Sequence, residues 1–147
     1  ATVDAAAGTG YTIENIYDSD GFIEESNGKF QGSYPSTQTK YVVENGNVTS
    51  VEAYTGGKLE YTQKNTYSDD LNKADLLFNQ NQPNMYGRVS KNLVKTMLRT
   101  YADGKTEKYE YTYNLSKNDF VQSLTQTYTD KTGKKTTQVN KYDYKCF

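Results

Sequence analysis

Pairs of turn-forming residues recur along this sequence at intervals that match the length of a β-strand. The pairs are Asp20-Gly21, Asn27-Gly28, Asn45-Gly46, Gly56-Gly57, Asp103-Gly104 and Thr132-Gly133. Such pairs favour tight hairpin turns, because glycine adopts positive φ angles at little cost and asparagine or aspartate tolerates them. Strand-length segments between hairpin turns pair with their neighbours in the chain. The spacing therefore predicts an antiparallel meander.

The composition agrees with strands and places tyrosine in the core. Thr (19 residues) and Tyr (15) favour sheets, whereas seven Ala and eight Leu offer little support for helices. Leu, Ile, Val and Phe together number only 25 of 147 residues, a low fraction that is also found in disordered chains. The formal net charge of -1 opposes disorder, because no self-repulsion holds the chain open. We therefore expect a folded domain whose core is built largely from tyrosine.

The C-terminal half allows the strand register to be worked out, because a turn fixes which residues face each other. As a two-residue turn, Asp103-Gly104 would pair Leu98 with Tyr109. A four-residue loop at 116–119 and a three-residue loop with Gly133 in the left-handed conformation extend the same sheet. These three turns predict one buried face: Val94, Leu98, Tyr109, Tyr111, Tyr113, Phe120, Leu124, Tyr128, Tyr142 and Tyr144. They predict an exposed face as well: Lys95, Met97, Arg99, Tyr101, Lys108 and Glu110.

The N-terminal half gives a less regular pattern. Strands are expected at 11–17, 22–26, 37–44, 47–55 and 58–67. Two-residue turns at 45–46 and 56–57 would leave Ser50, Glu52 and Gln63 on the apolar face. Either one turn is longer than two residues, or the inner face is partly wet. Residues 1–10 are small and polar, so we expect a flexible segment there, followed by a single β-rich domain over 11–147.

One segment, 69–82, lacks the alternation of a strand. Leu71, Ala74, Leu77 and Phe78 follow a helical spacing, with Ser68 as a candidate cap. We expect one short helix near residues 69–80 that covers an open end or edge of the sheet. The predicted fold is therefore all-β: an antiparallel meander that forms a curved sheet or partly open barrel, with one short helix.

The sequence gives catalysis little support. It has no His, the residue that serves most often as a general base or a metal ligand. Glycoside hydrolysis requires two carboxylates on facing sides of a cleft. The acidic candidates are Glu107, Glu110, Asp143, Asp69 and Asp70, and nothing in the sequence brings two of them together. We expect no enzyme, no catalytic residue, no metal site and no cofactor.

Other local features have simple interpretations. The run Asp18-Ser19-Asp20-Gly21 begins like a calcium loop but lacks the remaining ligands, so an ordinary turn is favoured. Cys146 is the single cysteine, and a free thiol is favoured over a cross-link between chains. Dispersed Lys and Arg argue against a nucleic-acid partner. The longest apolar run has three residues, which is too short for a membrane-spanning helix.

The segment Tyr86-Gly87-Arg88-Val89-Ser90-Lys91-Asn92-Leu93-Val94-Lys95 resembles the Gly-x-x-Ser-Lys-Asn-Leu segment of a Bacteroidetes domain of unknown function. The resemblance covers residues 41–144. It implies a porin-like fold, meaning a curved antiparallel sheet or barrel, and no catalytic residue. It also implies a periplasmic or cell-surface protein, secreted or anchored by a lipidated cysteine in an N-terminal segment that this sequence does not contain.

Together these observations predict a non-enzymatic exported domain of the cell envelope, or a secreted one, with a binding or structural role. The alternative is a carbohydrate-binding module that uses exposed aromatic side chains on a sheet face. Tyr101, expected on the polar face beside Arg99, is the best contact candidate in that alternative. The partner stays open between a glycan and another envelope protein.

Overall fold

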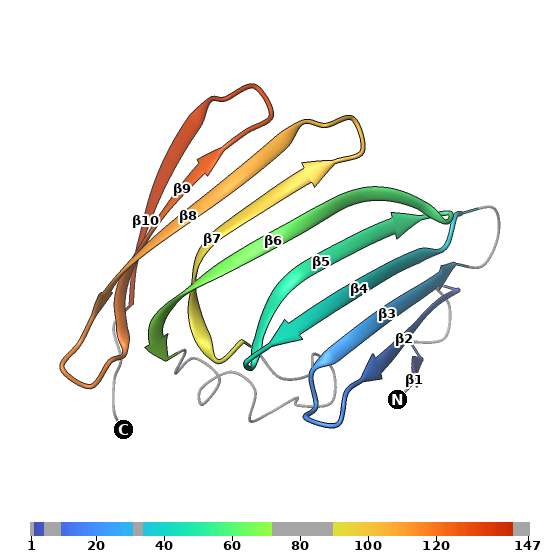
Figure 1. Ribbon diagram of the computed structural model, residues 1–147, viewed down its shortest axis with the longest axis horizontal. Helices are drawn as coiled ribbons and strands as arrows, with labels where there is room; N and C mark the ends of the chain where they lie inside the picture. The colour runs from blue at the N-terminus through green and yellow to red at the C-terminus, as the bar shows by residue number, and fades with distance from the viewer. Residues whose placement is uncertain (1, 5–9, 31–33, 72–89, 143–147) are drawn as a thin grey trace.

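The computed structural model describes residues 2–4, 10–30, 34–71 and 90–142, which form one ten-stranded antiparallel sheet (Figure 1). The strands are β1 (Thr2–Asp4), β2 (Tyr11–Tyr17), β3 (Ile23–Phe30), β4 (Thr37–Glu44), β5 (Asn47–Thr55), β6 (Lys58–Leu71), β7 (Asn92–Tyr101), β8 (Thr106–Leu115), β9 (Val121–Thr129) and β10 (Lys135–Lys141). Each strand pairs with the next one in the chain. The predicted all-β antiparallel meander is confirmed. Among the described residues the sheet is curved and open, because β1 pairs only with β2 and β10 only with β9.

Two kinds of hairpin turn connect the strands. The pairs Asn45-Gly46 and Gly56-Gly57 form two-residue turns with positive φ at both positions, as predicted. Other hairpins use three-residue loops that end on a residue with positive φ: Gly21, Gly104, Asp119 and Gly133. The predicted four-residue loop at 116–119, which would have placed Leu124 opposite Tyr111, is wrong, because the Ser116 N–H donates to the carbonyl of Phe120 at 2.8 Å and the loop is 117–119. In the loop that ends on Gly133, the N–H of Gly133 donates to the carbonyl of Asp130 at 2.9 Å. The predicted three-residue loop at Gly133 is confirmed, and so is its register, since the N–H of Tyr142 donates to the carbonyl of Gln122.

The predicted register between β7 and β8 is wrong by one residue. The N–H of Tyr101 donates to the carbonyl of Lys105 at 2.9 Å, so the loop is 102–104 and not the pair 103–104. Met97 consequently lies opposite Tyr109, and Arg99 opposite Glu107. Because side chains alternate along a strand, this slip exchanges the two faces of β7. Leu98, predicted to be buried, therefore lies opposite Lys108 and is 39 % exposed. Met97, Arg99 and Tyr101, predicted to be exposed, lie on the same face as the tyrosines.

Two other irregularities preserve part of the predicted face. Val94 lies opposite Tyr67, because a bulge between Thr66 and Tyr67 returns it to the tyrosine side. Leu124 lies opposite Tyr113 where Tyr111 was predicted, a shift of two residues that keeps the side chain on the same face. The predicted burial of this face is wrong in degree, because its tyrosines are only partly buried and Tyr142 is 45 % exposed. Tyr144 lies outside the described residues.

Bulges also account for the mixed face predicted in the N-terminal half. One interrupts the β4–β5 pairing between Val42 and Val43, and another the β5–β6 pairing between Ala53 and Tyr54. Each extra residue exchanges the faces beyond it. Ser50 and Glu52 therefore lie opposite Lys64 and Thr62, on the other side of the sheet from Gln63. The turns keep two residues, and the inner face is partly polar at Gln63.

The pair Asn27-Gly28 is not a turn, contrary to the sequence prediction. It lies inside β3, where Gly28 pairs with Ile13 on one side and Thr37 on the other. A Cβ built on Gly28 would contact Thr37 Oγ1 and would approach Tyr11 Oη to 2.9 Å. Glycine is therefore required here because two side chains cross the strand, and not because the chain reverses.

The expected helix does not begin where it was predicted. Residues 69–71 belong to β6, and Leu71 pairs with Asn92. The side-chain Nδ2 of Asn92 also donates to the backbone carbonyls of Asp69 and Asp70, at 3.2 and 3.3 Å. These pairings outweigh the weak capping pattern at Ser68. Residues 72–80 lie outside the described residues. In the segment expected to be flexible, 1–10, Thr2–Asp4 form β1, and most of the rest lies outside the described residues.

Burial is concentrated at one end of the sheet. The most buried apolar side chains among the described residues are Phe22, Val51 and Leu93, which are 5–8 % exposed. The start of β7 is bound to the β4–β5 turn there. Its Lys91 N–H donates to the carbonyl of Gly46 at 2.8 Å, and the Asn92 N–H donates to Asn47 Oδ1 at 2.9 Å.

Candidate functional site

One side of β6–β9 carries most of the aromatic side chains of the sheet. We call it the tyrosine face and define it by the strand registers: Tyr61, Gln63, Asn65, Tyr67, Val94, Met97, Arg99, Tyr101, Glu107, Tyr109, Tyr111, Tyr113, Leu124, Gln126 and Tyr128. All of these side chains are partly exposed. None of them is lysine, whereas the other side of the same strands carries Lys64, Lys108 and a series of threonines.

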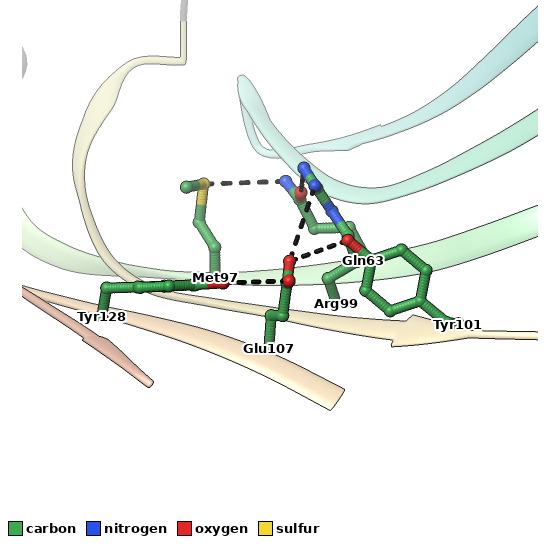
Figure 2. A network of polar contacts seen from close by, with 6 residues as sticks. All are labelled: Gln63, Met97, Arg99, Tyr101, Glu107 and Tyr128. Carbon is green, nitrogen blue, oxygen red and sulfur yellow. Dashed lines mark hydrogen bonds and ion pairs between the residues drawn. The ribbon is translucent and has the colours of Figure 1, made fainter. Parts of the chain in front are cut away.

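Glu107 lies at the centre of a polar network on this face (Figure 2). The hydroxyl of Tyr101 donates to its Oε2 at 2.7 Å, and the hydroxyl of Tyr128 donates to its Oε1 at 2.9 Å. The guanidinium of Arg99 lies 4.0 Å from Oε2. These contacts join three neighbouring strands, since Tyr101 and Arg99 come from β7, Glu107 from β8 and Tyr128 from β9.

The network shifts the ionisation of both partners. The hydrogen bond from Tyr101, followed by the one from Tyr128, lowers the pKa of Glu107 below its ordinary value of 4.5. The same carboxylate raises the pKa of Tyr128 to about 12, because ionising that phenol would lose the donated hydrogen bond and set two negative charges side by side. At neutral pH the network therefore holds an ionised Glu107 that accepts hydrogen bonds from two tyrosine hydroxyls.

Arg99 extends the network to β6. Its Nη2 donates to Gln63 Oε1 at 3.1 Å, and its guanidinium carbon lies 4.2 Å from the centre of the Tyr61 ring. Gln63 in turn donates through Nε2 to Asn65 Oδ1 at 3.0 Å and lies 3.6 Å from the sulfur of Met97. Arg99 Nε is buried and has no hydrogen-bond partner among the described residues. The guanidinium is therefore fixed by stacking and by its terminal nitrogens.

The tyrosine rings also contact one another. Tyr109 lies 4.7 Å from Tyr128 and 6.5 Å from Tyr111, measured between ring centroids. Tyr61 and Tyr101 are 5.8 Å apart across the β6–β7 pair. Such cross-strand aromatic pairs stabilise a sheet that has little core. They also leave a broad surface of ring atoms and hydroxyl groups.

The carboxylates considered from the sequence are not brought together. Glu110 lies on the opposite face from Glu107 and pairs with Lys108 at 2.8 Å. Asp69 and Asp70 lie near the end of β6, and Asp143 lies outside the described residues. Paired carboxylates are what glycoside hydrolysis requires. What the network on the tyrosine face offers is hydrogen bonding and aromatic contact.

The part of the chain that the structure describes contains no group of acidic, His or Cys side chains arranged to hold a metal ion. The side chain of Asp18 serves the β2–β3 turn, accepting from the N–H groups of Asp20 and Phe22 at 2.9 and 2.8 Å. No helix in the described ranges is long and apolar enough to cross a membrane. Cys146 lies outside those ranges.

Tyr101 illustrates what the sequence prediction missed. It was expected on the polar face, but it lies on the tyrosine face and donates to Glu107. The missed signal was the position of Gly104. In Tyr101-Ala102-Asp103-Gly104-Lys105 the glycine is the fourth of five residues, as in residues 130–134, for which the three-residue loop was recognised.

A second candidate is a small pocket of about 250 Å³ over β2–β4, lined by residues that include Glu14, Asn27, Lys29 and Gln38. Drug-sized ligands usually bind in pockets of roughly 300–1,000 Å³ with predominantly apolar walls. This pocket is smaller and polar. The tyrosine face is therefore the stronger candidate.

No protein-family model matches the chain, and no curated protein matches it.

Proposed function

We propose that this chain is a non-enzymatic interaction domain whose tyrosine face binds another macromolecule. The observation that carries the proposal is the partition of side chains across β6–β9. Tyrosine, Met97 and Arg99 lie on one side, and Lys64 and Lys108 lie on the other. The lysine that contacts the tyrosine side, Lys131, comes from the β9–β10 loop and lies over the Tyr101 ring. Protein interfaces are enriched in aromatic residues, methionine and arginine and depleted in lysine. Lysine is costly to desolvate and is usually kept where water remains.

The shape of the sheet also favours a large partner over a small ligand. The tyrosine face spans four neighbouring strands of an open sheet, whereas small molecules are bound in concave pockets. Its central charges are already paired within the chain, through Arg99 and Glu107. A partner that covers them leaves neither charge without a counter-charge, which keeps the cost of desolvation low.

The proposed setting is the cell envelope or the secreted fraction of a bacterium. It is supported by the resemblance of residues 86–95 to an exported Bacteroidetes domain and by no other observation. Residues 86–89 lie outside the described residues. In residues 90–93 the side chains have structural roles: Ser90 Oγ accepts from the Val48 N–H at 3.1 Å, and Leu93 is 5 % exposed.

Carbohydrate binding is the second candidate, and the partial exposure of Tyr109, Tyr111 and Tyr128 favours it. Partly exposed rings would stack on the faces of sugars, with Gln63 and Glu107 supplying planar polar groups for hydroxyls. A carbohydrate would bind the same tyrosine face as a protein partner. The two proposed functions therefore differ in the partner and not in the residues that bind it.

Two substitutions in adjacent residues of β8 test the proposal. Tyr111→Lys places a charge on the tyrosine face, and Thr112→Lys places the same charge on the other face, where Thr112 is exposed. Gln126→Lys, on the tyrosine face but already polar, is a second variant that preserves the aromatic contacts. Circular dichroism checks the fold of each.

Binding is measured against a glycan array and, by sedimentation, against the chain itself. We expect binding to at least one of these, weakened at least tenfold by Tyr111→Lys and Gln126→Lys and unchanged by Thr112→Lys. Absence of binding to both, or equal weakening by the variants on the two faces, would contradict a role for the tyrosine face.

A further inference from the structure

We infer that the partner of the tyrosine face is the tyrosine face of a second copy of this chain, so that two single-layer sheets form a sandwich. This inference rests on the proposed function, and it names the occupant of the same surface. Stable domains bury a sheet face against a second layer of secondary structure. The described residues form one sheet and supply no second layer.

The described residues bury the tyrosine face only in part. Phe22, Val51 and Leu93 are the most buried apolar side chains among the described residues, whereas Tyr109, Tyr111 and Tyr113 remain partly exposed. The aromatic side of β6–β9 thus resembles half of a core. Packing two such sides about 10 Å apart is the geometry of an aligned β-sandwich.

The size of the face fits a stable dimer. Its fifteen side chains, all partly exposed, are at least half of the roughly 20–30 residues that each partner contributes to a standard interface. The face can therefore form the centre of such an interface, and residues around it would complete the contact.

The charge pattern permits self-association through this face. A dimer with twofold symmetry places the same patch against itself, so any unpaired charge meets a like charge. The charged side chains at the tyrosine face are held within one copy: Arg99 and Glu107 form a pair, and Lys131 of the β9–β10 loop lies over the Tyr101 ring, 3.2 Å from its centre. On the opposite face Lys108 is paired with Glu110, but Lys64, opposite Leu98, has no ion pair among the described residues and would repel its copy.

The free edge of β10 is a poorer route to the same dimer. If two copies of β10 paired antiparallel about Gln138, Lys135 of each would face Lys141 of the other. Like charges placed directly opposite each other destabilise a strand pair, and lysine is a common guard against edge pairing. We therefore assign the association to the face and not to the edge.

Sedimentation velocity and equilibrium from about 1 to 200 µM test the inference, using the whole chain. The wild type is expected to be a dimer at the upper concentrations. Gln126→Lys introduces two lysines into the symmetric interface, and we expect it to weaken dimerisation at least tenfold, equivalent to about 1.4 kcal/mol or more. Thr112→Lys, on the opposite face, should leave the dimerisation constant unchanged.

The other outcomes separate the inference from the proposed function. A wild type that is monomeric throughout, but binds a glycan in a way that Gln126→Lys weakens, overturns the dimer and leaves the proposed function in place. A monomer whose tyrosines resist iodination overturns both, because the chain then covers its own face. A dimer that Thr112→Lys breaks and Gln126→Lys does not would also overturn both, because it uses the other face.

Discussion

Replacing Glu107 with glutamine probes the central network of the tyrosine face through the pKa of Tyr128. The Tyr128 hydroxyl donates to Glu107 Oε1 at 2.9 Å, and this hydrogen bond is the main reason why the pKa of Tyr128 is raised from 10.0 to about 12. Glutamine has nearly the same shape but no charge. It also keeps one acceptor oxygen where the carboxylate offers two, so the hydroxyls of Tyr101 and Tyr128 would compete for it.

We expect the pKa of Tyr128 to fall from about 12 towards 10.0 in Glu107→Gln. Tyr113 supplies an internal control, because burial raises its pKa to about 12 and Glu107 has no part in that shift. Its value should not change. The measurement is a titration of the ring-carbon resonances of labelled tyrosine, with Tyr128→Phe to assign the signal and circular dichroism to define the pH range of the folded protein.

The same substitution alters the pH dependence of stability at both ends. A raised tyrosine pKa stabilises the folded state below about pH 10, and this contribution is lost as the pH rises through about 12. The lowered pKa of Glu107 means that its ionised form stabilises the folded state above pH 4.5. This stabilisation is lost as the pH falls and the carboxylate is protonated. Glu107→Gln should make the free energy of unfolding less dependent on pH at both the acidic and the alkaline end. If the pKa of Tyr128 stays within about 0.3 of the wild-type value, a difference too small to carry the effect of a lost charge, the assignment to Glu107 is wrong.

Three further substitutions test the packing, each by urea unfolding. The Leu93 side chain is 5 % exposed, so Leu93→Ala should lower the free energy of unfolding by about 2–4 kcal/mol. The Leu98 side chain is 39 % exposed, so Leu98→Ala should lower it by under about 1 kcal/mol. Equal losses would contradict the observed register of β7. Gly28→Ala should cost about 1–3 kcal/mol, because its Cβ would crowd Thr37 Oγ1 and Tyr11 Oη, and a stabilised protein would show that the crossing side chains move away freely. Asn92→Ala removes the hydrogen bond that Asn47 Nδ2 donates to Asn92 Oδ1 at 3.0 Å and those that Asn92 Nδ2 donates to the carbonyls of Asp69 and Asp70, but it keeps the one donated by the Asn92 backbone N–H. It should cost about 1–3 kcal/mol, with faster amide exchange at Lys91 as the accompanying sign; unchanged exchange would indicate that the start of β7 is held by other contacts.

The amino-acid sequence by itself determined the fold class and most strand positions. Regular spacing of glycine-containing turns, with Thr and Tyr between them, predicted the meander. The strands at 11–17, 37–44 and 47–55 were placed at the bounds that the structure shows. Turn chemistry is local, since Gly133 needs only its own neighbours to adopt a φ of 86°. The turns at 45–46 and 56–57 and the loop at Gly133 were confirmed for this reason, whereas the lengths predicted for the loops before Lys105 and Phe120 were wrong by one residue.

The tertiary structure decided which side chains share a face. Bulges at Val42/Val43 and Ala53/Tyr54, and one between Thr66 and Tyr67, depend on how neighbouring strands fit, and the sequence carries no local sign of them. Tyrosine weakens the usual check, because an amphipathic ring is acceptable on a buried or an exposed face. The predicted register of β7 therefore satisfied the alternation of apolar and polar residues although it was wrong by one residue.

The candidate site depended on that choice. Arg99 and Tyr101 come within reach of Glu107 only when the loop after β7 has three residues, because the side-chain period of a strand is two and one extra residue moves the whole set across the sheet. The end of β6 was decided in the same way, since the pairing of Leu71 with Asn92 joins residues that are distant in the sequence. Local pattern thus determined the strands and turns, and the contacts between strands determined the surface they present.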